Sequence, residues 1–129
     1  MKSILIVEDE PIGALLLNKM LSKHFKCEMA QNSNECKLYC QNKHFEFVIL
    51  DINLGTDSID GMDLLQDLKN LPNCNNTNFI AITAYAMPDD KEKYLKMGFD
   101  FYFSKPIIYK EVIDTLLLIG ENNTIRSNP

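Results

Sequence analysis

The sequence lacks an apolar run that could cross a membrane, because a spanning helix needs about 20 consecutive apolar residues and no run approaches that length. It also lacks the pattern of a secretory signal, since acidic residues follow the first apolar residues directly in MKSILIVEDE. No internal repeat or linker-like segment divides the 129 residues. We therefore expect one cytoplasmic domain, long enough to enclose a single hydrophobic core.

Basic residues are in short supply. The chain has 13 Lys and Arg residues against 18 Asp and Glu residues, which gives a formal net charge of -5. Proteins that bind nucleic acid through phosphate contacts need a basic surface. The composition therefore argues against direct binding of nucleic acid by this domain.

The four cysteines occur without the secreted context in which disulfides form, so we expect free thiols. Cys36, Cys40 and His44 are spaced four residues apart and could share one helix face. A structural zinc ion takes four ligands, whereas this helix supplies two or three. Cys36, Tyr39 and Cys40 also have the spacing of a core-facing stripe, so we interpret the cysteines as packing residues.

Short apolar runs alternate with segments of helical periodicity. The runs cover residues 4–7, 27–30, 47–50, 79–82 and 101–103. Runs of this kind are typical of strands buried on both faces. The alternation predicts an α/β domain in which a five-stranded parallel sheet has helices on both faces.

The helical segments carry their own signals. Ile12, Leu15, Leu16 and Met20 form the apolar stripe of the first helix, and Pro11 suits its first turn. Near the other end, the segment 121–129 is polar. We expect the folded domain to cover residues 1–120 and this segment to be a disordered tail.

Polar side chains follow four of the five apolar runs, where the carboxyl ends of parallel strands meet at one edge of a sheet. The polar residues are Glu8, Asp9, Glu10, Asp51, Thr83, Ser104 and Lys105, with Ala84 and Pro106 next to the last two strand ends. Three carboxylates in one pocket would repel each other by about 4 kcal/mol per close pair unless a cation lies among them. Mg²⁺ or Mn²⁺ suits such oxygen ligands, and a lysine with a threonine hydroxyl suits a phosphoryl group. Asp51 could then act as a nucleophile and form an acyl phosphate.

Four motifs in order resemble the receiver domain of bacterial two-component response regulators. They are ILIVEDE with Glu8 and Asp9, FVILDINLG with Asp51, AITAYA with Thr83, and FYFSKPI with Tyr102 and Lys105. The likeness extends over residues 2–119. It implies the flavodoxin-like (βα)5 receiver fold.

The resemblance implies that Asp51 accepts a phosphoryl group from a phosphohistidine on a sensor histidine kinase or a histidine phosphotransfer protein. Asp9 and Asp51 would bind the metal directly, together with the backbone carbonyl of Asn53. Glu8 would act mainly through a bound water. The resemblance also implies a signalling domain that loses its phosphate by autodephosphorylation, and not an enzyme that turns over a substrate.

The same resemblance assigns the remaining site residues. Thr83 and Lys105 would hold the phosphoryl oxygens, with the backbone of Asn53 and Ala84 in contact with the phosphate. Tyr102 would be the aromatic switch that changes rotamer as Thr83 moves. The bond before Pro106 would be cis.

Two positions near the phosphate are expected to set its lifetime. Asn53 and Tyr85 lie two residues beyond Asp51 and Thr83, where they can admit or exclude water. The loop NLGTDSIDG departs from the family's usual pattern, because Gly55 stands where a proline is common and the loop is longer before its Asp-Gly pair. This departure affects docking and loop order and leaves the metal and phosphate ligands in place.

By analogy with the family, the output is expected to be a protein contact at the fourth helix, fifth strand and fifth helix. Met87, Tyr102, Ile108 and Tyr109 are the residues expected on that surface. The resemblance is compatible with a monomer or a phosphorylation-dependent dimer. No direct contact with nucleic acid or membrane is expected.

Other interpretations of these residues remain open. Glu8, Asp9 and Glu10 could simply cap the first helix, and Lys105 could be a solvated loop residue. A phosphatase of the haloacid dehalogenase type would need an acid where Asn53 stands. A flavin-binding domain would need a glycine- and hydroxyl-rich first loop in place of an acidic one. A receiver-like interaction module without chemistry is the third alternative.

Overall fold

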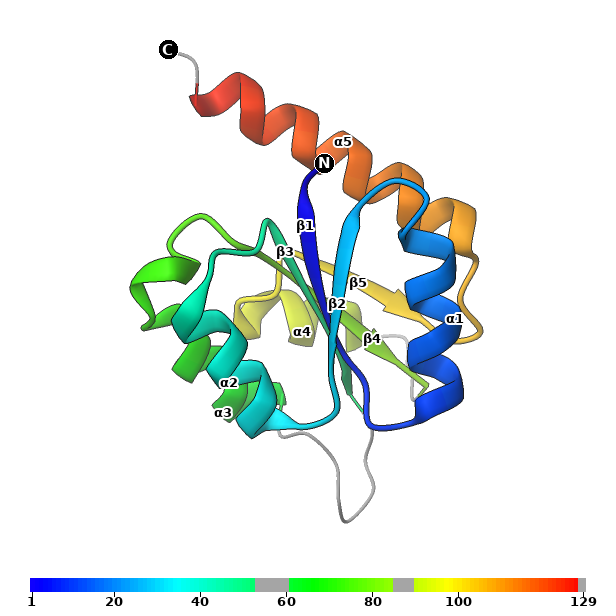
Figure 1. Cartoon of the computed structure of the whole chain (residues 1–129), viewed down its shortest axis with the longest axis horizontal. Helices are drawn as coiled ribbons and strands as arrows, with labels where there is room; N and C mark the ends of the chain where they lie inside the picture. Colours follow the sequence, from blue (N-terminus) through cyan, green and yellow to red (C-terminus); the bar gives the residue numbers. More distant parts are fainter. Residues whose placement is uncertain (53–60, 85–89, 128–129) are drawn as a thin grey trace.

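The structure is a computed structural model that describes residues 1–52, 61–84 and 90–127. Strands and helices alternate along the chain (Figure 1). The strands are β1 Ser3–Val7, β2 Lys26–Ala30, β3 Phe47–Ile52, β4 Asn78–Thr83 and β5 Phe101–Ser104. The helices are α1 Pro11–Leu21, α2 Ser33–Asn42, α3 Gly61–Lys69, the 3-10 turn η1 Pro72–Cys74, α4 Asp90–Met97 and α5 Tyr109–Ser127.

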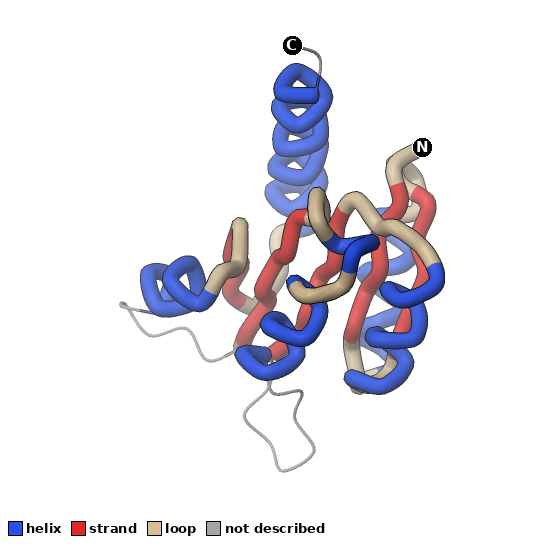
Figure 2. The backbone as a smooth tube through the Cα atoms, turned by 90° about the vertical axis from the view of Figure 1, so that its left-hand side faces the viewer, coloured by secondary structure: helices blue, strands red, loops and turns tan. Residues whose placement is uncertain are grey.

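All strand pairs are parallel, and the sheet order is β2-β1-β3-β4-β5. One face of the sheet packs against α1 and α5, and the other against α2, α3 and α4 (Figures 1 and 2). The prediction of a five-stranded parallel sheet with helices on both faces is confirmed. This order makes β3 the central strand, so its last residues lie in the middle of the carboxyl edge.

The central strands are buried along their length because their apolar side chains alternate between two cores. Leu5, Val48 and Leu50 point into the core under α2, α3 and α4. Ile6 and Ile49 point into the core under α1 and α5. Full burial of one such side chain stabilises the fold by about 1.5–3 kcal/mol. A sheet with two covered faces has no solvent-facing side, which explains why these runs are continuously apolar.

The helix α1 begins where the sequence predicted, but its buried face differs from the predicted stripe. Its buried residues are Ala14, Leu17 and Leu21. The predicted stripe was wrong, because Ile12, Leu15 and Leu16 are 68%, 58% and 47% exposed and Met20 is half-buried. Both sets have helical spacing, so α1 carries more apolar surface than the sheet can cover. The result is an apolar helix face in solvent.

In α2, the interpretation of the cysteines as packing residues is supported by their positions. Cys36 and Cys40 are fully buried, and Cys74 of η1 packs in the same core. Hydrogen bonding to Cys36 together with burial raises the pKa of Cys40 to about 12, against an opposing contact with Cys74. Among the described residues, no group of three or more His, Cys, Asp or Glu side chains could by itself hold a metal ion. Because its pKa is raised, the Cys40 thiol stays protonated at neutral pH.

The helix α5 continues through residue 127, beyond the boundary expected at residue 120. Figure 2 shows it extending past the edge of the sheet toward the C-terminus. Residues 121–127 are therefore helical and not irregular, since no proline interrupts the helix before Pro129. The division of the chain into a domain and a tail stays a prediction. No helix in the described ranges is long and apolar enough to cross a membrane.

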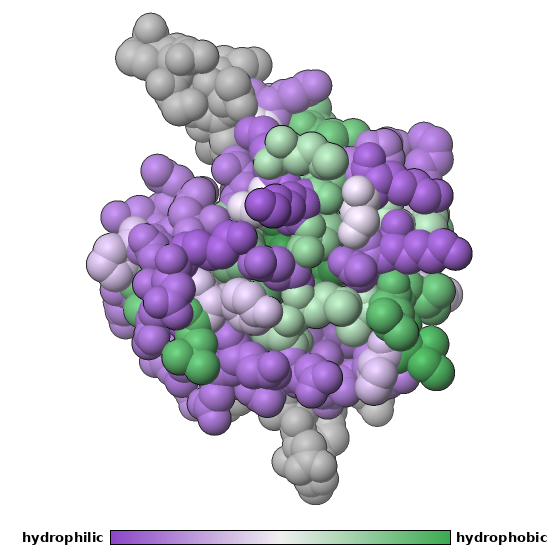
Figure 3. Space-filling model, viewed as in Figure 1, coloured by the Kyte–Doolittle hydropathy of each residue, from purple (hydrophilic) through white to green (hydrophobic). Residues whose placement is uncertain are grey.

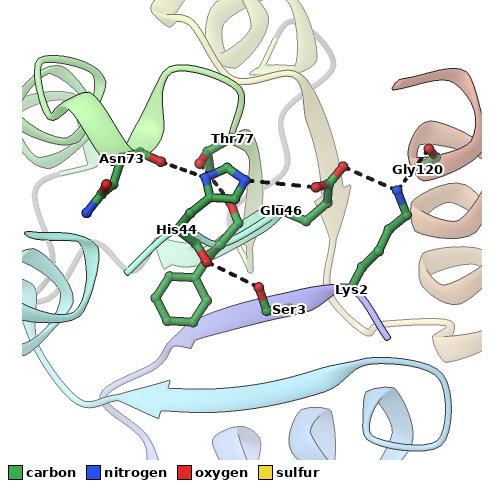
Figure 4. A network of polar contacts seen from close by, with 8 residues as sticks. Lys2, Ser3, His44, Glu46, Asn73, Thr77 and Gly120 are labelled. Atoms are coloured by element: carbon green, nitrogen blue, oxygen red, sulfur yellow. Dashed lines mark hydrogen bonds and ion pairs between the residues drawn. The ribbon is translucent and has the colours of Figure 1, made fainter. Parts of the chain in front are cut away.

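A polar network closes the amino edge of the sheet, opposite the acidic edge (Figure 4). Lys2 donates to the carbonyl of Gly120 in α5 at 3.2 Å and lies 3.5 Å from a Glu46 carboxylate oxygen. The other Glu46 oxygen is 4.0 Å from His44, whose Nδ1 is 2.7 Å from the carbonyl of Asn73. The network thus links α5, the start of β3 and η1.

One buried hydrogen bond at this edge gives a stability prediction. The Thr77 hydroxyl donates to the carbonyl of Phe45 at 2.7 Å, and Thr77 is 9% exposed. We expect Thr77→Val to leave that carbonyl unpaired and lower the free energy of unfolding by about 1–2 kcal/mol. In a thermal melt, each kcal/mol corresponds to a decrease of about 3–6 °C in the melting temperature. Ser3→Ala, which removes a solvent-exposed 3.3 Å bond to His44, is the control and should cost less than about 0.5 kcal/mol. Equal losses in both variants would contradict the assignment.

Candidate phosphoacceptor site

The candidate site lies at the carboxyl edge, where β1, β3, β4 and β5 end. Asp51 is the fifth residue of β3 and pairs in register with Ile82 of β4. Thr83 ends β4 and pairs with Ser104, the last residue of β5. Lys105 follows directly, and its backbone N–H donates to the Thr83 carbonyl at 2.8 Å. The sheet therefore brings together residues that are up to 97 positions apart, from Glu8 to Lys105.

Asp51 in β3 and Glu8, which directly follows the neighbouring strand β1, are buried carboxylates. Each is 2% exposed. The Lys105 ammonium lies 2.5 Å from Asp51 Oδ2 and 3.8 Å from Glu8 Oε2, and its side chain is 31% exposed. The structure thus brings three of the predicted site residues together, with one cation serving two anions. Such a site has excess negative charge on two side chains that are almost fully buried.

Glu8 and Glu10 have different roles, which the sequence alone did not separate. The backbone N–H of Glu10 donates to Glu8 Oε1 at 3.0 Å and so orients the Glu8 carboxylate. The Glu10 carboxylate is the N-cap of α1 and accepts from the backbone N–H groups of Ile12 and Gly13. The capping interpretation therefore holds for Glu10. Asp9, between them, is exposed at the rim of the site.

Burial raises the pKa of Asp51 above its usual range, and hydrogen bonding and charge from Lys105 oppose this rise. Asp51 Oδ1 is buried and accepts no hydrogen bond from any described residue. A buried oxygen without a donor is costly unless a ligand or an ion satisfies it. Oxygen donors of this kind fit a divalent cation such as Mg²⁺, which needs few protein ligands because it keeps several waters. The residues present therefore fit the expected metal.

The other predicted residues that the structure describes lie in or directly after β4 and β5. Thr83 is fully buried and Ala84 is exposed. The bond between Lys105 and Pro106 is cis, as expected. Tyr102 is half-buried and stacks on Tyr94 of α4, with ring centroids 5.3 Å apart and ring planes 15° apart.

The contact between Tyr102 and Tyr94 was not predicted, because no local pattern relates the two rings. A cavity of about 210 Å³ beside the acidic pair was not predicted either; among its lining residues are Gly13, Asp51 and Lys105. Asn53, Tyr85 and Met87, which the sequence analysis singled out, lie outside the described residues.

A family model described as the response regulator receiver domain matches residues 4–117. The chain therefore belongs to the response regulator receiver domain family, the domain of two-component signalling. This confirms the resemblance drawn from the sequence motifs.

The chain is 30% identical over 119 residues to the sensor histidine kinase RcsC of Escherichia coli K12, and the match covers 92% of this chain but 12% of the kinase. Its fold is similar to a response regulator receiver domain protein from Methanospirillum hungatei JF-1, with a TM-score of 0.84, 23% identity, and 98% of each chain covered. It is also similar to the receiver domain of sensor histidine kinase PA1611 from Pseudomonas aeruginosa PAO1, with a TM-score of 0.77, 23% identity, and coverage of 89% and 93%. That structure has a magnesium ion coordinated in its active-site cleft.

The raised pKa of Asp51 predicts a pH-dependent gain in stability on removing its charge. Between about pH 4, where a free aspartate titrates, and the higher folded pKa, the native state binds more protons than the unfolded state. Stability therefore falls as pH rises through this window, and the full penalty applies above the folded pKa. We expect Asp51→Asn to raise the melting temperature near pH 7 by about 3–6 °C without Mg²⁺. The gain should shrink as pH falls toward about 4.

Calorimetry of both proteins from acidic to neutral pH measures this gain. Asp67→Asn is the control, because it removes a carboxylate that is 55% exposed and pairs with Lys37 on the surface. Exposed pairs contribute about 0–1 kcal/mol, so the control should melt close to the parent at every pH. A lower melting temperature of Asp51→Asn at neutral pH would show that the ion pair with Lys105 outweighs the cost of burial.

Proposed function

We propose that this domain is the phosphoacceptor of a two-component phosphorelay, with Asp51 as the nucleophile. The supporting observation is the buried Asp51 carboxylate, which has one oxygen without a donor and the other 2.5 Å from Lys105. In the transfer, an Asp51 oxygen forms a bond to phosphorus as the bond from phosphorus to the donor histidine nitrogen breaks. The Lys105 ammonium lies where it can neutralise the added charge.

A divalent cation completes the proposed site. Asp9, Asp51 and the Asn53 carbonyl would hold Mg²⁺ or Mn²⁺, and Glu8 would act through a water. The magnesium ion in the receiver domain of the Pseudomonas kinase supports this assignment. When bound, the metal neutralises charge on the transferring phosphoryl oxygens. The residues of this chain orient the acceptor, and Glu10 holds Glu8 in position through its backbone N–H.

The proposed switch couples Thr83 to Tyr102. Thr83 would contact the phosphoryl group together with Lys105 and the backbone of Asn53 and Ala84. Since the Lys105 N–H is bonded to the Thr83 carbonyl, the ends of β4 and β5 are tied together. Asn53 and Tyr85 would set the lifetime of the acyl phosphate, which the domain itself hydrolyses. The domain then acts as a signalling switch and not as an enzyme with a released substrate.

Output is proposed at α4, β5 and α5. A cavity of about 520 Å³ lies between β5 and α5, and it is lined by Tyr102, Ser104, Ile108, Glu111 and Thr115, among others. Ile108 is 59% exposed, which leaves an apolar anchor for a protein partner. Tyr109 is half-buried at the start of α5. The domain would act as a monomer or as a phosphorylation-dependent dimer.

Intact mass spectrometry tests the proposed chemistry. With Mg²⁺ and acetyl phosphate or a phosphorylated histidine protein, the mass should rise by one phosphate, about 80 Da. Asp51→Asn should abolish the gain, and removal of divalent metal with a chelator should prevent it in the parent. A gain that survives in the Asn variant would exclude Asp51 as the acceptor. A parent that never gains mass would instead favour the interaction module without chemistry.

The exposed face of α1 is the proposed docking surface for the phosphodonor protein. Figure 3 shows hydrophobic side chains gathered over the first half of α1, which begins directly after the acidic residues of the site. Ile12, Leu15 and Leu16 supply the exposed apolar area. Exposed clusters of large apolar side chains mark protein contacts more often than isolated ones do.

We expect Leu15→Asp to slow phosphoryl transfer from a phosphorylated histidine phosphotransfer protein by about tenfold or more, because a charge would be buried in the contact. Labelling by acetyl phosphate, which needs no docking, should be unchanged. Leu38→Asp on α2 is a matched control, since both leucines are 58% exposed. Equal slowing by the two variants would argue against α1 as the docking surface.

A further inference from the structure

Gly13 does not adopt the positive φ that would require a glycine. Gly13 is the third residue of α1, and Gly98 is the only described glycine with positive φ. A methyl group at this position would lie 3.0 Å from Glu10 Oε2 and 3.6 Å from Glu8 Oε2. The missing side chain therefore leaves space directly beside the candidate site.

That space is part of the cavity of about 210 Å³ beside Asp51. Gly13 and Leu17 line it from α1, and Asp51 lines it from β3. Glu8 and Lys105, which directly follow β1 and β5, also line it. A water molecule occupies about 30 Å³ of liquid, so several waters can fit. Since Asp51 is 2% exposed, a cavity that reaches its side chain is a route for water to a buried carboxylate.

We propose that Gly13 controls the access of water and small phosphodonors to Asp51 by keeping this cavity open between α1 and the connection from β5 to α5. This inference rests on the proposed phosphorylation of Asp51 and adds a determinant of the lifetime of the phosphoryl group. A side chain at position 13 would occupy volume that water uses in the parent. Gly13 is a positioning residue in this sense, because it contributes space and no chemical group.

The step that the cavity water serves is hydrolysis of the acyl phosphate. The water oxygen bonds to phosphorus as the bond between phosphorus and the Asp51 oxygen breaks. The products are the Asp51 carboxylate and dihydrogen phosphate, which keeps both water protons. Lys105 lines the same cavity and stays beside the carboxylate that is released.

The test compares the parent with Gly13→Ala and Gly13→Leu. At saturating Mg²⁺, we expect Gly13→Leu to slow both hydrolysis of the phosphorylated domain and labelling by acetyl phosphate by about tenfold, with Gly13→Ala slower than the parent by about threefold. Gly120→Ala is the matched control, because the three atoms nearest its new methyl group all belong to the flexible Lys2 side chain, at the opposite edge of the sheet. The control should keep the parent's rates. Saturating metal removes any contribution from altered Mg²⁺ affinity.

A double variant separates filling of the cavity from displacement of the N-cap. If the effect of Gly13→Ala acts only through its close contact with Glu10, then adding it to Glu10→Ala will change nothing, and the proposal is overturned. If it acts by filling the cavity, the slowing persists in the double variant.

Crystal structures of the parent and Gly13→Leu without metal or phosphate give a readout independent of activity. Ordered waters should lie between position 13 and Lys105 in the parent and be absent in the variant. Waters in the same places in both proteins would overturn the inference. If the parent is labelled normally and the Gly13 variants have the parent's rates, the inference about Gly13 is overturned and the proposed function is not. A parent that takes no label would overturn the proposed function and this inference together.

Discussion

The buried carboxylate of Asp51 is the constraint on which the rest of the site depends. A central strand must be apolar to be covered by helices on both faces. In β3 the first four residues are apolar, and the ionisable Asp51 is the fifth. Burial raises the pKa of that group, so the fold pays an electrostatic cost for it. The sheet order offsets this cost by bringing Lys105 across the end of β4, with Glu8 competing for the same ammonium. One ammonium beside two buried carboxylates leaves a net negative charge, which a second cation could neutralise.

Much of the fold follows from short-range sequence patterns. Runs such as residues 47–50 are apolar without alternation, and alternation of these runs with helical segments implies parallel strands. The face of α1 did not follow, because Ala14, Leu17 and Leu21 compete with a second stripe of larger side chains. The larger side chains of Ile12, Leu15 and Leu16 led to the prediction that their stripe is buried, whereas it is exposed. The end of α5 did not follow either, because polarity alone does not stop a helix that meets no proline.

The candidate site could be predicted as a set of residues but not as a geometry. Strand order places the ends of β1, β3, β4 and β5 at one edge, so the identities of Glu8, Asp51, Thr83 and Lys105 could be read from position. Which acid faces the pocket and which caps α1 depends on one backbone turn at Glu10. The stacking of Tyr94 on Tyr102 and the space beside Gly13 depend on contacts between distant elements. No local periodicity encodes such contacts.

Lys105 connects the proposed acceptor Asp51 to the ends of two other elements. Its ammonium is paired with Asp51, while its backbone N–H is bonded to Thr83 and its chain continues into the connection before α5. A phosphoryl group on Asp51 would replace one carboxylate charge with a bulkier dianion, so the lysine must adjust or Thr83 must move toward it. Tyr102 of β5 lies three residues before Lys105 in the chain and stacks on Tyr94 of α4, so these two rings join β5 to α4. Tyr94 therefore belongs to the contact between β5 and α4 and not to the cluster of Glu8, Asp51 and Lys105 at the carboxyl edge.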